Sequence, residues 1–236
     1  VTKPVTVAAA MTLVDEGKIS LDDPVERYLP EFRQQQGPDG EHYAFTIRHL
    51  MTHTSGLVES PPTRRPGWLV LHEEWLTQTL PDIVSAIAKS RLLFKPGSQV
   101  QYSNSAMFVL GRLMEVVSGQ SYAQLVKQRI LDPLGMNDTF FVPPAAEAGR
   151  VSAIYEETQG KRQAVFRFNP ELKISNAAPD GGLFSYPAEL FKFLQMFLDN
   201  DGKVLSQTAV REMLKEQAPG WGLGWRLEEG GFGHRG

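Results

Sequence analysis

The sequence contains no cysteine, so disulfides, thiolate zinc sites and a cysteine nucleophile are all excluded. It also lacks any run of about 18 apolar residues, the length that a helix needs to cross a membrane. Neither sign of charge predominates, because 24 Lys and Arg stand against 27 Asp and Glu, for a formal net charge of −3. The charge balance therefore gives no reason to expect nucleic acid or an anionic membrane as a partner, and favours a small-molecule substrate.

What the chain does have is an ordinary globular composition. Of its 236 residues, 42% are hydrophobic and 22% are charged, enough for one large domain or two small ones with a sizeable core. No internal repeat or low-complexity tract interrupts it.

The first predicted element is a helix with Pro4 in its first turn and Gly17 past its end, the asymmetry that is typical of helices. Apolar residues occupy nearly every side of the segment between them, which predicts a helix buried in the middle of the structure. A reactive residue in its first turn would stand on a rigid support at the positive end of the helix dipole. That is a favourable position for a nucleophile.

The middle of the chain is predicted to be largely helical. Thr46 can cap a short helix, Ser103 or Asn104 can cap an amphipathic helix that ends at Gly119, and Ser121 can open another through a capping box. Other elements follow from the alternation and periodicity of apolar residues. They are strands at 139–142, 151–156 and 164–168, helices at 187–199 and 207–216, and a terminal hairpin at 221–236.

Together these elements predict an α/β (α+β) fold, with an antiparallel sheet flanked by helices beside a large, mostly helical second region. Residues 1–20 and 175–236 are expected to form the sheet-containing part and residues 21–174 the helical part, with the active site between them. Both ends look cut, because the first residues lie inside a buried helix and the last inside a strand whose edge nothing covers. The chain is therefore expected to be a trimmed piece of a longer protein.

Acyl transfer by a serine needs a base for the hydroxyl proton, a donor for the leaving group and amide N–H groups for the oxyanion. One solution is a Ser-x-x-Lys turn at a helix start, where positions i and i+3 share one helix face. Lys3 stands in this context, and its partner would be a serine at the position just before Val1.

A second candidate element is Tyr102-Ser103-Asn104, directly ahead of the helix that ends at Gly119. A phenolate is stabilised beside an ammonium, so Tyr102 is expected to act first as the base and then as the acid. Asn104 offers amide donors and an acceptor to a substrate carbonyl. The third element is His234-Arg235-Gly236 on the last strand, where glycine lets a substrate backbone approach the strand edge.

In this order and spacing, these elements resemble the serine β-lactamase and penicillin-binding-protein superfamily, most closely its class C β-lactamase-like branch. That branch also holds family VIII esterases, D,D-carboxypeptidases and D-aminopeptidases. The resemblance runs along nearly the whole chain. It rests on Thr2-Lys3-Pro4, GKISLDDPVERYLP (17–30), TIRHLMTHTSGL (46–57), FKPGSQVQYSN (94–104), PLGM (133–136), GGLFS (181–185) and Gly233–Gly236.

The resemblance implies a serine hydrolase that works through an acyl-enzyme on an ester, amide or β-lactam. In this scheme Lys3 would activate the serine, Tyr102 would shuttle the proton, Asn104 would orient the acyl-side group, and His234 with Gly236 would line the edge strand. The oxyanion donors would come from the nucleophile and from the residue after Gly236, both outside this chain. The resemblance implies no cofactor or metal. It implies a periplasmic or secreted location.

Histidine at position 234 stands where many β-lactamases carry the lysine of Lys-Thr-Gly. A histidine is mostly neutral at pH 7 and holds a substrate carboxylate less firmly. This substitution favours esterase or peptidase chemistry over β-lactam hydrolysis.

Plainer interpretations of the same residues are a solvated lysine at a helix end, a packing tyrosine and an N-cap at Ser103 or Asn104. The alternative function is a non-catalytic, ligand-binding member of the same fold. His49 and His53 have the spacing of a zinc pair, but no third ligand is evident, which favours a structural role. Arg64 and Arg65 are expected to be a solvated loop pair, the Gly220–Gly224 run is not taken as a nucleotide loop, and the Phe/Leu stripe at 190–198 is expected to be core.

Overall fold

The structure, a computed structural model, describes residues 1–64, 77–158, 160–171, 173–175 and 177–235. Helix α1 spans Thr2–Asp15 and is followed by Gly17, whose backbone is left-handed (φ 67°). Residues 2–13 are all buried, so the prediction of a helix surrounded by protein on every side is confirmed. Pro4 is tolerated because the first turn needs no backbone donor there.

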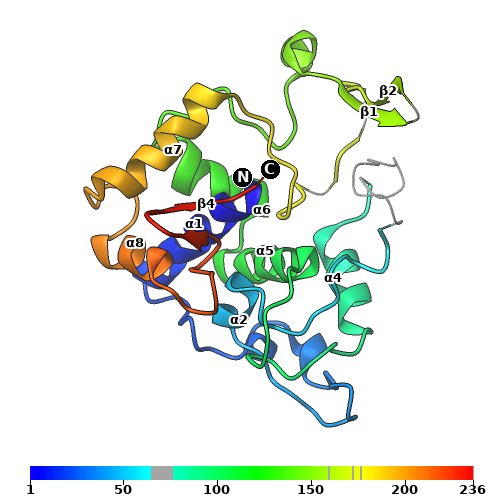
Figure 1. Cartoon of the computed structure of the whole chain (residues 1–236), viewed down its shortest axis with the longest axis vertical. Helices are drawn as coiled ribbons and strands as arrows, with labels where there is room; N and C mark the ends of the chain where they lie inside the picture. The colour runs from blue at the N-terminus through cyan, green and yellow to red at the C-terminus, as the bar shows by residue number, and fades with distance from the viewer. Residues whose placement is uncertain (65–76, 159, 172, 176, 236) are drawn as a thin grey trace.

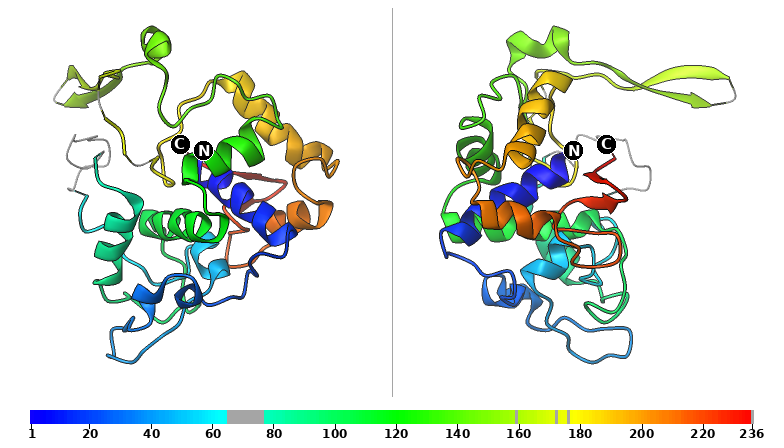
Figure 2. Two further views of the ribbon diagram at one scale, coloured as in Figure 1. Left: turned by 180° about the vertical axis from the view of Figure 1, so that it is seen from behind. Right: turned by 60° about the vertical axis from the view of Figure 1, so that its left-hand side comes forward.

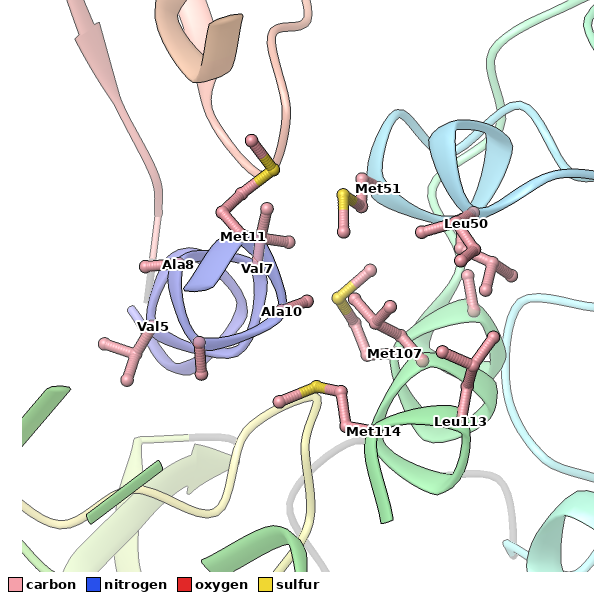
Figure 3. Close-up of a cluster of buried hydrophobic side chains, with 14 of the residues drawn as sticks. Val5, Val7, Ala8, Ala10, Met11, Leu50, Met51, Met107, Leu113 and Met114 are labelled. Carbon is pink, nitrogen blue, oxygen red and sulfur yellow. The ribbon is translucent and has the colours of Figure 1, made fainter. Parts of the chain in front are cut away.

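The core lies between α1 and two neighbouring helices, α2 (Ile47–Met51) and α5 (Asn104–Ser118). Figure 3 shows Val7 and Ala10 of α1 on the side that faces Met51 of α2 and Met107 of α5, with Met11 next to Val7. All five side chains are almost completely buried. Unbranched methionines fill the uneven spaces between the helices, and this packing fixes where the first turn of α1 lies.

Polar caps begin these helices as the sequence predicted. Thr46 and Ser121 make capping boxes for α2 and for α6 (Tyr122–Val126), and Ser103 caps α5 through the N–H of Ala106. Gly119 ends α5 in a left-handed conformation (φ 70°). The other helical segments are η1 (Val25–Arg27), η2 (Pro30–Phe32), α4 (Leu80–Ala88), η3 (Lys127–Leu131), η4 (Ala145–Arg150), α7 (Pro187–Asp199) and α8 (Gln207–Leu214).

Sheet structure among the described residues is small, and consists of two two-stranded antiparallel pairs. Strands β1 (Ile154–Thr158) and β2 (Lys161–Phe166) form one hairpin, and β3 (Arg226–Glu228) and β4 (Gly231–Gly233) form the other. The mixed helix and antiparallel-sheet class is confirmed. The strand expected at 139–142 is reduced to a single bridge, Phe140 to Phe184, because no further described residues pair there.

In space, the β3–β4 hairpin lies beside α1, with α7 and α8 on the same side, while α4 and α5 lie across the molecule (Figure 1). The β1–β2 hairpin projects away from the helices (Figure 2). The start of α1 and the end of β4 lie close together in every view. The predicted division into residues 1–20 with 175–236 and residues 21–174 stays a prediction.

Helix α7 buries a different set of side chains from the predicted one. Phe193, Met196 and Phe197 are buried, whereas Phe191 is 57% exposed and Leu198 is 66% exposed. The prediction that both belong to the core is wrong, because apolar residues lie all around this helix and Trp225 selects the face that packs. No helix in the described part of the chain combines the length and apolar character needed to cross a membrane.

Candidate active site

Lys3 is buried in the first turn of α1, with only 4% of its surface exposed. Its ammonium donates a hydrogen bond to the backbone carbonyl of Asp180 (Nζ–O 2.7 Å) and lies 4.7 Å from the centre of the Tyr102 ring. A cation over an aromatic face is attracted by the negative face of the ring. The structure thus brings together two predicted site residues that are ninety-nine positions apart in the sequence.

The turn that carries Asp180 is joined to α1 at two further points. The N–H of Leu183 donates to the hydroxyl of Thr2 (3.2 Å), and the hydroxyl of Thr6 lies 2.8 Å from the carbonyl oxygen of Pro179. Helix α5 presses on the same turn, since a Cβ at Gly111 would lie only 2.6 Å from Pro179. The carbonyl that orients Lys3 is therefore held on a rigid support.

Burial is the main influence on the amine of Lys3 and lowers its pKa from 10.5 to about 8. The carboxylate of Asp180 opposes this change and the guanidinium of Arg64 adds to it. At pH 7 about one molecule in ten then carries a neutral Lys3 amine, which can accept a proton.

Tyr102 is held from behind by the cap of α5. The Ser103 N–H donates to Nδ1 of His53 (3.2 Å), and the Ser103 hydroxyl donates to the carbonyl of Val58 (2.9 Å). The ring of His53 lies 4.5 Å from the Tyr102 ring and 4.7 Å from that of Trp221. A packed aromatic group and two hydrogen bonds thus fix the direction of the phenol.

The prediction of a stabilised Tyr102 phenolate is wrong. Burial raises the pKa of the phenol to about 12, and the nearby carboxylates of Asp180 and Glu59 add to that increase. The Lys3 ammonium lies over the ring and its influence does not outweigh burial. The phenol of Tyr102 is therefore protonated at neutral pH.

Asn104 begins α5 with its backbone N–H donating to the carbonyl of Glu59 (2.6 Å). Among the described residues its side-chain amide makes no hydrogen bond, and it is only partly buried. Its place next to Tyr102 agrees with a role in binding a substrate, which stays a prediction.

His234 follows β4 and lies with its ring 6.3 Å from that of Tyr102. Its Nδ1 donates to the carbonyl of Arg235 (2.5 Å), which leaves Nε2 as a buried acceptor without a partner in the described part of the chain. Burial is the main influence that lowers its pKa to about 4, and the positive charge of Lys3 acts in the same direction, so the ring is neutral at pH 7. Gly236, predicted to line the same strand, lies outside the described residues.

A cavity of about 410 Å³ opens at this place, lined by Tyr102, Trp221, Arg226, His234 and Arg235. Its size suits a small molecule. Tyr102 lines the cavity, whereas Lys3 does not; the buried amine of Lys3 contacts the Tyr102 ring instead.

Sequence reasoning missed several residues of this site. Arg64 was expected to be solvated, but it pairs with the buried carboxylate of Asp180 (Nη1–Oδ2 2.6 Å). Trp221 lies in the glycine-rich run at 220–224, whose order offered no signal for a substrate cavity. The contacts of Arg64 and Trp221 join residues far apart in the sequence, so no local pattern indicates them. His53, which packs behind Tyr102, lies in the TIRHLMTHTSGL motif, and this motif was the available signal for it.

The two histidines of that motif have separate structural roles. His49 caps α2 by accepting the Thr46 N–H at Nδ1, while His53 lies beyond the helix end at Met51 in a left-handed conformation (φ 58°). The expected structural role is therefore supported. Within the described residues no group of three or more His, Cys, Asp and Glu side chains is arranged to hold a metal ion.

Comparison with known proteins identifies relatives of this chain. Protein Rv1367c of Mycobacterium tuberculosis is 36% identical over 90% of this chain and 57% of its own length. Esterase EstB of Burkholderia gladioli is 31% identical over 95% of this chain and 64% of its own. The chain thus spans less than two thirds of these curated relatives.

Among solved structures, a D-stereospecific amidohydrolase from Streptomyces sp. superposes with a TM-score of 0.73 and 29% identity. The superposition covers 95% of this chain and 68% of that structure. The family model described as Beta-lactamase matches residues 1–236. With the buried lysine, the tyrosine above it and the adjoining cavity in place, the chain belongs to the Beta-lactamase family.

Proposed function

We propose that the full-length protein is a serine hydrolase that forms an acyl-enzyme with an ester or amide substrate, and that its catalytic serine immediately precedes Val1. The observation that carries the proposal is the Lys3 amine, 4.7 Å from the centre of the ring of Tyr102, which lines a cavity. A residue three positions before Lys3 would share its helix face. Its hydroxyl would then lie within reach of the amine.

The pKa values of Lys3 and Tyr102 support one assignment of the proton steps. The neutral Lys3 amine, whose pKa is lowered to about 8, takes the serine proton as the serine oxygen attacks the substrate carbonyl carbon. The Tyr102 phenol, with its pKa raised to about 12, gives its proton to the leaving oxygen or nitrogen as the bond to the acyl carbon breaks. The lysine ammonium returns a proton to the tyrosine, and water later releases the acyl group.

The neutral ring of His234 favours esters and amides that lack a free carboxylate over β-lactams, which carry one. A substrate carboxylate gains no charge–charge attraction from a histidine whose pKa is about 4. Its free Nε2 accepts hydrogen bonds instead, which suits an amide N–H of a peptide substrate. Arg226 and Arg235 on the cavity wall remain the cations that could meet an acidic group.

The test uses the full-length protein. A fluorophosphonate is expected to add to the serine before Val1, detected by mass spectrometry of the modified peptide. In parallel, p-nitrophenyl butyrate and D-alanine amide, which lack a carboxylate, are expected to be hydrolysed faster than nitrocefin. A folded protein that carries the serine and gains no adduct would contradict the proposal, and ligand binding without an adduct would favour the non-catalytic alternative.

A further inference from the structure

Asp180 is the point where three parts of the chain meet. Its backbone carbonyl accepts the hydrogen bond of Lys3 (2.7 Å), and its carboxylate, which is only 4% exposed, accepts one from Arg64 (2.6 Å). The second carboxylate oxygen is buried without a partner in the described part of the chain. A buried charge of this kind is costly unless a partner neutralises it.

Arg64 supplies that partner from the segment after α2. Its side chain is 19% exposed, so the pair is largely shielded from water and from salt. The segment before it, at Glu59, also receives the N–H of Asn104. One segment thus contacts the start of α5, next to Tyr102, and the turn that orients Lys3.

The charges of this pair act on Lys3 in opposite directions. Asp180 raises the pKa of the amine and Arg64 lowers it, while burial is the larger influence. The remaining groups that face Lys3 are the Tyr102 phenol, the neutral rings of His53 and His234, and the α-amino group of Val1. Of these, only the Val1 amino group can carry a charge at neutral pH, and it is a peptide nitrogen in any longer chain.

We propose that Arg64 and Asp180 are a positioning pair that sets the charge state of Lys3 by holding two opposite charges beside it. Neither residue touches the reacting atoms. The inference rests on the proposed serine hydrolase function, because the charge state of Lys3 matters to catalysis only if Lys3 is the base.

The test measures the rate of inactivation of the full-length protein by a fluorophosphonate between about pH 5.5 and 10. The acidic limb of this profile reports the base of the free enzyme. Asp180→Asn keeps the shape and the backbone carbonyl but removes the negative charge, so the limb is expected to move to lower pH. Arg64→Gln removes the positive charge, so the limb is expected to move to higher pH, each by about one pH unit.

The double variant Arg64→Gln/Asp180→Asn removes both charges and is expected to return the limb close to that of the parent protein. Arg64→Lys keeps the charge and should leave the limb in place even if it slows the reaction. Matched controls are Arg162→Gln and Asp201→Asn, which remove charges from surface ion pairs with Glu157 and Lys203. They should not move the limb.

The inference is overturned if the acidic limb stays in place in both single variants, or moves in the same direction in both. A purely structural pair would lower the inactivation rate of both variants without shifting their limbs in opposite directions. If one single variant fails to fold, the direction of the other decides. If both fail, the double variant must fold again, and its failure to fold overturns the inference. A parent protein that is not inactivated at all contradicts the proposed function, which is a separate outcome.

Discussion

At the scale of the residue, the site depends on two side chains whose pKa values burial moves away from their usual ranges. Tyr102→Phe keeps the ring against the Lys3 amine and removes only the phenolic proton donor. Because a positioned acid or base contributes about 10²- to 10⁴-fold to a rate, kcat for an amide substrate such as D-alanine amide, whose nitrogen must be protonated to leave, is expected to fall by that factor in the full-length protein. Tyr155→Phe, on the exposed β1 strand, is the matched control and should be neutral. Equal activities of the two variants would contradict the role of Tyr102.

Lys3 also makes stability depend on pH. Its pKa is about 8 in the folded chain and 10.5 when free, so between these values the unfolded chain binds more protons and the free energy of unfolding rises with pH. Lys3→Met is expected to raise that free energy at pH 7 by on the order of 3 kcal/mol, and to abolish hydrolysis. Urea unfolding at about pH 7, 8.5 and 10 checks this, with the exposed Lys18→Met as control. A destabilised Lys3→Met at pH 7 would show that burial of the ammonium costs little.

His53 makes the free energy of unfolding depend on pH in the acidic range. Burial lowers its pKa to about 3, below the free value of 6.5, so its contribution to stability is present above pH 6.5 and is lost as the pH falls toward 3. His53→Asn keeps an acceptor for the Ser103 N–H and tolerates the positive φ of this position. Its unfolding free energy should therefore fall less steeply between pH 6.5 and about 4 than that of the parent, measured by urea titration. An unchanged slope would assign the acid sensitivity to other groups, such as His234.

At the scale of the element, a residue that caps a helix can also position a loop of the site. Ser103 caps α5 and also fixes the loop that carries Tyr102, whereas Ser121 caps α6. Replacing either serine by alanine is expected to cost about 1 kcal/mol in the free energy of unfolding. Only Ser103→Ala should also lower kcat/KM, because loss of the hydrogen bond to Val58 lets the loop that carries Tyr102 move. Equal losses of activity in both variants would indicate a general effect of stability.

At the scale of the whole molecule, an aromatic cluster joins α7 to the hairpin that carries His234. The rings of Phe193, Phe197 and Phe232 pack around Trp225 at centroid distances of 5.0–6.1 Å. Phe193→Ala is expected to lower the free energy of unfolding by about 3–5 kcal/mol, because the cavity cannot close between two packed elements. Phe191→Ala, on the exposed side of the same helix, should change it by less than about 0.5 kcal/mol. Similar losses in both variants would mean that Phe191 is covered in the full-length protein.

The amino-acid sequence alone determined the features that depend on neighbours a few positions apart. Pro4 and Gly17 bound α1, and Ser103 and Gly119 bound α5, because caps and positive-φ glycines act through bonds within a turn. The residue types of an acyl-transfer site were visible as well, since Lys3 and the Tyr-Ser-Asn turn are short motifs.

Only the tertiary structure decided what long-range contacts control. It showed which face of α7 packs on Trp225, placed Arg64 against the carboxylate of Asp180, and reduced the expected strands to short hairpins. It also reversed the expected acidity of Tyr102, because the pKa of a phenol depends on its burial and on carboxylates brought from distant parts of the chain. Local sequence patterns do not indicate contacts between distant residues. Burial and neighbouring charges change a pKa only once the chain has folded.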